Sequence, residues 1–242
     1  GAQWARAWAD AGLAVIGLQH PGSDDAAYAA LAAAPPAERA ARLRAATGPQ
    51  QLVARAGDVR FVLDELGRRR REGRCDLGRI DPDRIGLAGH SMGAWTVQAL
   101  AGQRWGGERR LIDRRPRAFV GLSGSQLEPG DPAQLFDGIA RPYLVISGTR
   151  DGGAEEDIVA RRTAVWRGLP ADGRKYLALF GDATHMMFAG NRPATLPLGQ
   201  RVEADVIRLT IAFWRRWLLE DRRADAVLAN PGLTAADRWE QK

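Results

Sequence analysis

The chain has 242 residues, 45% of them hydrophobic, and a formal net charge of +6 at pH 7, which suits one globular domain over residues 1–242. No apolar run approaches the ~18 residues of a membrane-spanning helix, so no transmembrane segment is expected. With three histidines, the single cysteine Cys75 and no glycine-rich phosphate loop, the sequence predicts no intrachain disulfide, no metal site and no cofactor.

The first part of the chain predicts helices and one strand. Residues 1–12 have the pattern of a helix, and the apolar residues 13–19 follow as a strand. Residues 23–50 are rich in alanine and interrupted by Pro35 and Pro36, and we expect them to form a helical excursion near the site. The next helix, near residues 51–66, is expected to bury one stripe: Leu52, Ala56, Val59, Leu63 and Leu66.

Basic residues cluster once, at the expected end of that helix. Residues 68–71 are four arginines, and cations lie favourably at a helix C-terminus. The other basic residues are scattered, and no motif that reads DNA or RNA accompanies them. The sequence therefore predicts a solvated basic face and no nucleic-acid partner.

A G-x-S-x-G motif follows the strand-like residues 84–88. Its letters are GHSMG, from Gly89 to Gly93, and residues 94–101 behind it have a helical pattern. In this context the chain turns sharply from strand to helix and exposes the central hydroxyl, while the glycines let the backbone pass close to its neighbours. We predict that Ser91 is a nucleophile; the alternative is a turn that matches the motif by accident.

A serine nucleophile needs a base and an orienting acid, and later strands supply candidates. Strands are expected at residues 117–123, 142–147 and 175–180. His185 follows the last of them and Asp151 follows the one before, at the strand ends where open parallel sheets place their chemistry. In this interpretation His185 takes the proton of Ser91, and Asp151 fixes the imidazole.

Other residues compete for these two roles. His20 precedes Ser91, His90 lies inside the turn and points away from the working side of the serine, and His185 has the alternative of an ordinary loop histidine. Four more acidic residues are better explained by the start of the next helix or by a turn. They are Glu155, Glu156, Asp157 and Asp182.

The last part of the chain predicts a helix and a tail. A helix near residues 201–218 is expected to bury Val202, Val206, Thr210, Phe213, Trp214 and Trp217. Residues 219–242 are charged, and we expect a C-terminal tail that is frayed or packed as a helix. The predicted fold class is α/β, with a mostly parallel central sheet and helices on both faces.

Three segments of the chain resemble the α/β-hydrolase superfamily: residues 19–24 (QHPGSD), 83–94 (DRIGLAGHSMGA) and 148–151 (GTRD). More narrowly, the chain resembles serine esterases of the predicted dienelactone-hydrolase and platelet-activating-factor-acetylhydrolase-like branch, and bacterial polyesterases. The resemblance extends from Trp4 to about Trp217 and implies the triad Ser91, Asp151 and His185 in that chain order. Dienelactone hydrolases proper carry a cysteine nucleophile, so the family name does not define the substrate.

The resemblance also implies an oxyanion hole with two donors. The backbone N–H of Met92 is the expected first donor. Such hydrolases carry the second on a loop after a third strand, which we expect upstream of Gly1, so the first strands of the fold would be lacking here. In the alternative, residues 13–18 take the third position and residues 20–22 (HPG) form the oxyanion loop.

The implied activity is cofactor-free hydrolysis of a small-molecule or polymer ester through an acyl-enzyme. Five residues near the triad are expected to bind the oxyanion or the substrate. They are Met92, His90, Trp95, Met186 and Phe188. Trp95 has the alternative of packing into the core behind the turn. Two other functions are a catalytically silent α/β-hydrolase-like binding protein and a perhydrolase-type activity with the same triad.

Overall fold

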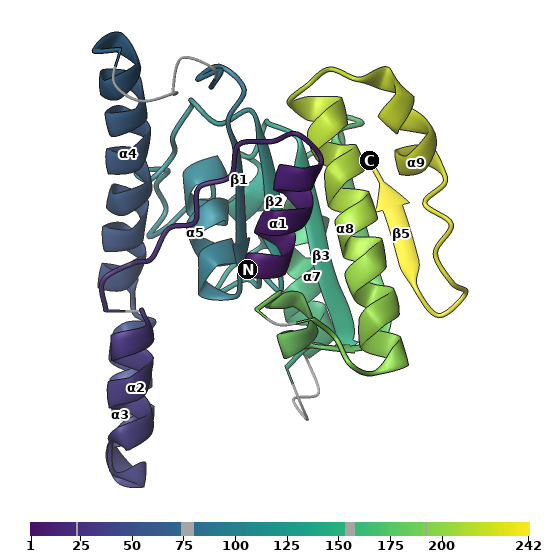
Figure 1. Ribbon diagram of the computed structural model, residues 1–242. Helices are drawn as coiled ribbons and strands as arrows, with labels where there is room; N and C mark the ends of the chain where they lie inside the picture. Colours follow the sequence, from purple (N-terminus) through teal and green to yellow (C-terminus); the bar gives the residue numbers. More distant parts are fainter. Residues whose placement is uncertain (23, 74–79, 153–157, 192) are drawn as a thin grey trace. The chain divides into compact units, whose positions relative to one another are not determined.

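A computed structural model describes residues 1–242 except 23, 74–79, 153–157 and 192 (Figure 1). The described residues form two compact units. The first combines Gly1–Val15 with Asp81–Lys242, and the second is Ile16–Ile80. That the two units make up the single expected domain stays a prediction.

The first unit is built on a sheet of five strands in the order β1-β2-β3-β4-β5. Strands β1 to β4 are parallel to one another, and β5 is antiparallel to β4. The bounds are β1 (Gly86–His90), β2 (Ala118–Leu122), β3 (Tyr143–Arg150), β4 (Lys175–Thr184) and β5 (Arg238–Gln241). The predicted mixed α/β architecture with a mostly parallel sheet is therefore confirmed.

Helices cover both faces of this sheet (Figure 1). Helices α1 and α8 pack against one face, and α5, α6 and α7 pack against the other. Successive strand residues face opposite sides, so Val120 joins the core under α8 while Phe119 joins the core under α5 and α7. The helical elements of the unit are α1 (Ala2–Asp10), α5 (Met92–Ala101), α6 (Pro132–Phe136), α7 (Ile158–Gly168), η2 (His185–Phe188), α8 (Pro197–Trp217), η3 (Arg222–Ala224) and α9 (Asp225–Ala229).

Four of the five expected strands are present, and the one expected at residues 13–19 is wrong. Residues 13–20 have no regular secondary structure, and Ile16 and Leu18 are 50% and 36% exposed. A strand depends on hydrogen bonds to a neighbouring strand, and no described strand pairs with this run. This finding also overturns the alternative in which residues 13–18 supply the third strand before an oxyanion loop at residues 20–22.

The C-terminal tail corrects a second expectation. Residues 219–242 contain short helical turns but end in strand β5, in place of a frayed or packed helix. Trp239 packs toward the core under α8, and its indole N–H donates to the carbonyl of Leu228 at 2.9 Å. On the opposite face of β5, Glu240 accepts a hydrogen bond of 2.8 Å from the indole of Trp166. This alternation, with a period of two, makes the segment a strand.

The second unit is helical. Its elements are α2 (Asp25–Ala33), α3 (Pro36–Ala46) and α4 (Pro49–Arg71). The excursion expected at residues 23–50 is therefore helical, and its place near the site stays a prediction. Helix α4 buries Leu52, Ala56, Val59 and Leu63 of the predicted stripe, while Leu66, its fifth member, is only half-buried. Cys75 lies outside the described residues. In the described parts of both units, every helix is too short or too polar to cross a membrane.

Candidate active site

Ser91 occupies a strained turn between β1 and α5. Its backbone has φ 55° and ψ −116°, a combination that residues with a side chain seldom adopt. The backbone N–H of Ser91 donates to the carbonyl of Leu122 at the end of β2, at 2.9 Å. Helix α5 begins at the next residue, Met92. The turn places the serine at the carboxyl edge of the parallel strands.

The glycine two residues before Ser91 is required by a close backbone approach. A Cβ atom at Gly89 would lie 2.3 Å from the carbonyl carbon and oxygen of Gly93 and 2.9 Å from the nitrogen of Ala94. All three are backbone atoms, so no rotation of a side chain relieves the clash. Gly89 therefore lets the end of β1 pack directly against the first turn of α5.

Asp151 follows β3 directly, and its side chain is fully buried. Its Oδ2 atom accepts a hydrogen bond of 2.7 Å from the hydroxyl of Ser147, and its Oδ1 atom lies 2.7 Å from Nδ1 of His185. Burial by itself would raise the pKa of Asp151. The hydrogen bond with His185, the guanidinium of Arg162 and the Ser147 hydroxyl outweigh burial and lower that pKa. Asp151 is therefore a carboxylate of fixed orientation.

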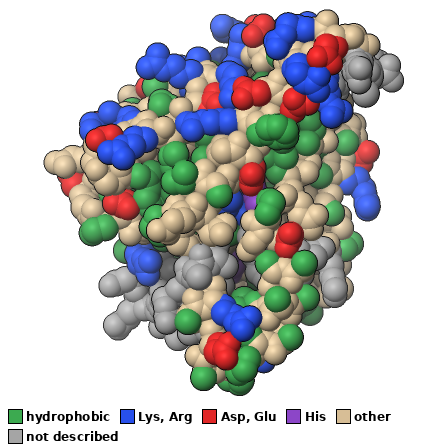
Figure 2. Space-filling model, turned by 90° about the vertical axis from the view of Figure 1, so that its left-hand side faces the viewer, with side chains coloured by type: hydrophobic (Ala, Val, Ile, Leu, Met, Phe, Trp, Pro, Cys, Tyr) green, Lys and Arg blue, Asp and Glu red, His purple; other side chains and the backbone are tan. Residues whose placement is uncertain are grey.

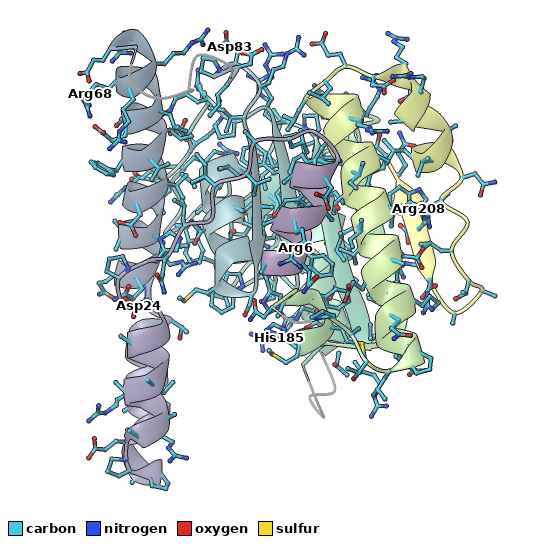
Figure 3. All side chains as sticks on the ribbon, in the orientation of Figure 1. Arg6, Asp24, Arg68, Asp83, His185 and Arg208 are labelled. Atoms are coloured by element: carbon cyan, nitrogen blue, oxygen red, sulfur yellow. The ribbon has the colours of Figure 1, made fainter. Side chains whose placement is uncertain are left out.

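His185 begins the turn η2 at the end of β4, at the lower end of the sheet in Figure 3. Its Nε2 atom lies 3.0 Å from the hydroxyl oxygen of Ser91, and its Nδ1 atom faces Asp151. A carboxylate can only accept, so the network assigns the imidazole proton to Nδ1 and leaves Nε2 as an acceptor. The structure thus brings together the three predicted side chains, which lie at the ends of three strands, and the arrangement can move a proton from Ser91 to His185.

The loop that carries His185 is held by the first helix. The indole N–H of Trp4 on α1 donates to the carbonyl of Phe188 at 3.0 Å, and the backbone N–H of Gln3 donates to the carbonyl of Gly190 at 2.8 Å. Gly190 has φ 58°, and a Cβ atom there would lie 2.3 Å from the indole nitrogen of Trp4. Helix α1 therefore fixes the position of the loop after the histidine.

His90 packs against the imidazole of His185. The two ring centroids are 4.6 Å apart, and Nε2 of His90 donates to the carbonyl of His185 at 3.0 Å. Burial, reinforced by the neighbouring His185, lowers the pKa of His90 to about 4. His90 is thus neutral at neutral pH and supports the backbone of His185. The sequence placed it among the oxyanion- and substrate-binding residues and did not predict this contact.

Two more predicted residues lie on the first turns of α5. Met92 is the first residue of the helix, and the first N–H groups of a helix have no acceptor within it. Its N–H is therefore suited to bind an oxyanion formed next to Ser91. Trp95 is half-buried, and its indole donates to the hydroxyl of Ser125 at 3.2 Å. The ring of Trp95 is neither fully in the core nor fully open to a substrate.

The two predicted residues after His185 have different environments. Met186 is 67% exposed. Phe188 is fully buried in the core under α8, with its ring centroid 6.1 Å from that of Phe180. The η2 turn thus directs this ring into the core, and its contact with a substrate stays a prediction.

The structure also places the competing residues. Asp182 is exposed, and its backbone N–H donates to the hydroxyl of Thr149 at 2.9 Å. It lies within β4 with a φ of 55°, so the turn expected at this residue is wrong. His20 belongs to the second unit, where its Nδ1 atom lies 2.7 Å from Oδ2 of Asp58. Three other candidates lie outside the described residues: Glu155, Glu156 and Asp157.

Arg162 on α7 is the site residue that the sequence analysis missed. It is buried, and its Nη2 atom lies 3.3 Å from Oδ1 of Asp151 and 3.2 Å from Nδ1 of His185. A signal was present in the sequence, because this arginine lies on an apolar stripe with i, i+3, i+4 and i+7 spacing. The stripe continues with Val165, Trp166 and Leu169.

Comparison with known proteins adds no family to this description, because no protein-family model and no curated protein matches the chain. Within the described ranges, no group of three or more His, Cys, Asp or Glu side chains could hold a metal ion. The interpretation of the site therefore depends on its own geometry.

Proposed function

We propose that this chain is a serine hydrolase with an α/β-hydrolase fold that cleaves carboxylic esters through an acyl-enzyme. The observation that carries the proposal is the hydrogen-bonded series from Ser91 to His185 at 3.0 Å and from His185 to Asp151 at 2.7 Å. The strained turn at Ser91 and the chain order of the three residues also support it, since both are typical of α/β-hydrolase triads.

The reaction begins when the Ser91 oxygen attacks the ester carbonyl and its proton moves to Nε2 of His185. Asp151 holds the imidazole and stabilises the imidazolium. The backbone N–H of Met92 donates to the developing oxyanion. Collapse of the tetrahedral intermediate breaks the ester C–O bond, and Nε2 protonates the departing alcohol. Water then repeats the sequence on the acyl-enzyme, which releases the acid and restores Ser91.

An ester is the substrate class that this arrangement favours. Met92 supplies one backbone donor, and each oxyanion donor contributes about 10²–10³ in turnover. Esters expel an alkoxide more readily than amides expel an amine, so they depend less on the oxyanion hole. The 67% exposed side chain of Met186, next in sequence to His185, favours an apolar acyl or aryl group over a charged one.

The test is hydrolysis of nitrophenyl esters of increasing acyl length by the wild type and three variants. We expect Ser91→Ala to lower kcat about 10⁶-fold and Asp151→Asn to lower it about 10⁴-fold. Asp182→Asn is the matched control, since this exposed aspartate does not contact the imidazole among the described contacts, and it should keep the wild-type rate.

A second readout is covalent labelling by a fluorophosphonate. The Ser91 oxygen forms a bond to phosphorus, fluoride leaves, and the serine proton passes to His185. Wild-type protein should gain one phosphonyl group, located on Ser91 by mass spectrometry of peptides, and Ser91→Ala should gain none. Equal ester hydrolysis by the wild type and Ser91→Ala, with no label on residue 91, would overturn the proposal.

A further inference from the structure

The guanidinium of Arg162 joins the acid and base of the site to the end of a neighbouring strand. Its Nε atom donates to the backbone carbonyl of Asp151 at 3.0 Å, and Nη1 donates to the backbone carbonyl of Ser123, the residue after β2. Its Nη2 atom reaches the carboxylate of Asp151 and lies beside the imidazole of His185. One side chain on α7 thus contacts the chain just after β2, the loop after β3 and the ring at the end of β4.

These contacts require an arginine. A guanidinium has five N–H donors in a rigid plane, so it can serve three acceptors in different directions at once. A lysine carries the same charge on one ammonium group at the end of a flexible side chain, so it cannot hold both the Ser123 and Asp151 carbonyls in one geometry. Because Nδ1 of His185 carries its own proton to Asp151, the nearby Nη2 group donates to the shared carboxylate and presents its charge to the ring.

We propose that Arg162 is a positioning residue of this site: its guanidinium fixes the Asp151 loop against the end of β2, and its charge opposes a second positive charge on the imidazole that accepts the Ser91 proton. This inference rests on the proposed function. It assigns Arg162 no contact with the substrate, so Arg162 acts through Asp151 and His185.

The positive charge of Arg162 acts on both of its titratable neighbours, Asp151 and His185. The Asp151 carboxylate is fully buried, and a nearby cation favours its ionised form, which agrees with its lowered pKa. The same cation opposes a second positive charge on the imidazole. Without Arg162, a buried carboxylate would draw a proton onto the Asp151–His185 pair at higher pH. A protonated imidazole cannot take the proton of Ser91. As the pH is lowered, activity without Arg162 would therefore be lost at a higher pH than in the wild type.

Few other charges face this pair among the described residues. His90 on β1 packs against the imidazole and is neutral above about pH 4. The amino group of Gly1 acts on His90 from further away. Ser147 on β3 contacts Asp151 as an uncharged hydroxyl. Among the described residues, the cation in direct contact with the acid of the triad is therefore Arg162.

The experiment compares Arg162→Gln, Arg162→Lys and the matched control Arg161→Gln, an exposed arginine one residue earlier on α7. The kcat/KM for an acetyl ester and the rate of fluorophosphonate labelling are measured between pH 4 and 9. Circular dichroism and thermal unfolding report whether each variant is folded. NMR of ¹⁵N-labelled imidazoles follows the protonation of His185 without any substrate.

For Arg162→Gln we expect the acid limb of kcat/KM to move up by about one pH unit or more, because charge and orientation are both lost. The rate at the plateau should fall about 10²-fold, since small errors of position have effects of this size. Arg162→Lys should keep the acid limb near its wild-type pH but retain most of the loss at the plateau. Arg161→Gln should match the wild type in both.

Two outcomes overturn the inference. In the first, Arg162→Gln is folded and less active, but its acid limb and its His185 titration stay at the wild-type pH; the arginine is then purely structural. In the second, Arg162→Lys has the wild-type plateau rate, which shows that the planar guanidinium is not needed. This outcome decides the question even if Arg162→Gln does not fold. Failure of the proposed function is separate, because Ser91→Ala would then hydrolyse as the wild type does while the NMR titration of His185 still shifted in Arg162→Gln.

Discussion

The two edges of the parallel sheet hold their polar groups in different ways. Four non-glycine residues in the described part of the chain have positive φ, and three of them lie at or near the carboxyl ends of β1, β2 and β4. They are Ser91, Ser123 and Asp182. The buried pair of Asp151 and Arg162 lies at the same edge. Backbone strain is thus concentrated at the edge where the candidate site lies, and a buried ion pair lies beside it.

At the amino edge, where the parallel strands begin, polar groups instead form exposed ion pairs. Asp83, just before β1, marks this edge at the upper end of Figure 3, opposite His185. Arg84 pairs with Asp81 at 3.0 Å and Arg174 with Asp172 at 3.0 Å. Figure 2 shows Lys and Arg side chains interspersed with Asp and Glu at its upper end. Lys175 differs from these pairs, because its side chain is buried while it contacts Asp172.

The contrast between the two edges indicates where the sequence is constrained. An unusual backbone conformation persists only where its surroundings impose it, and such residues cluster at functional sites. Exposed ion pairs contribute little, because water and salt screen them and both side chains lose freedom. We therefore expect substitutions at buried or closely packed positions of the carboxyl edge to have large effects on both stability and chemistry, and substitutions of exposed ion pairs at the amino edge to have small ones.

The largest effect is expected at Gly89. An alanine there would place its Cβ atom 2.3 Å from the backbone of Gly93, so β1 and α5 must separate. We expect Gly89→Ala to lower the free energy of unfolding by about 3 kcal/mol and to abolish most ester hydrolysis, since Ser91 moves with the turn. Urea denaturation and nitrophenyl ester kinetics measure the two effects.

Gly57→Ala is the matched control for this change. Gly57 lies within helix α4 of the second unit, and its added Cβ atom would meet nothing within 4 Å. Alanine in an open helical position is expected to stabilise the protein by up to about 1 kcal/mol. A Gly89→Ala protein with the wild-type unfolding midpoint would show that the close approach at the turn is not needed.

The next effect is a pH dependence at His90. The unfolded chain binds a proton at this residue below its ordinary pKa of 6.5, whereas the folded chain binds it only near a pKa of about 4. Between these values the unfolded state holds more protons, so stability falls as the pH falls through this window. We expect His90→Gln, which keeps a side-chain donor for the His185 carbonyl, to remove about 2 kcal/mol of this loss at pH 4.5.

The measurement is the free energy of unfolding of the wild type and His90→Gln at pH 7 and pH 4.5. The pKa of His20 in the second unit is also lowered, so His20→Gln separates its contribution of the same sign. If the wild type and His90→Gln lose equal stability between the two pH values, His90 titrates alike in the folded and unfolded chain, and the packing against His185 does not keep it neutral.

The predictable parts of the site were those with a local signal. The turn at Ser91 is encoded by two glycines within five residues, and the structure supplies the clash that explains Gly89. The positions of Asp151 and His185 follow from strand order, because the carboxyl ends of parallel strands meet at one edge. Arg162 was missed because an arginine is usually assigned to the surface, although its place on the apolar stripe of α7 indicated burial.

The errors in the fold have a common cause, which is that a strand needs a partner. Residues 13–19 are as apolar as the true strands, but no described strand pairs with them. Strand β5 is the opposite error, a strand that was not predicted. Its charged residues Arg238 and Glu240 flank Trp239, so the sequence shows no obvious apolar alternation. Its pairing with β4 and the contact of Glu240 with Trp166 depend on residues distant in sequence, which periodicity alone does not reveal.

The smallest effect is expected at the amino edge. Arg84 and Asp81 are 42% and 48% exposed, so their ion pair is well screened by water. We expect Arg84→Gln to change the free energy of unfolding by less than about 0.5 kcal/mol and to leave ester hydrolysis unchanged. Urea denaturation at low and at high salt is the appropriate measurement, because a pair that matters would lose its contribution as salt is added. A loss above about 1.5 kcal/mol, or a changed pH profile of activity, would mean that the amino edge also constrains the site and that the contrast between the two edges does not hold.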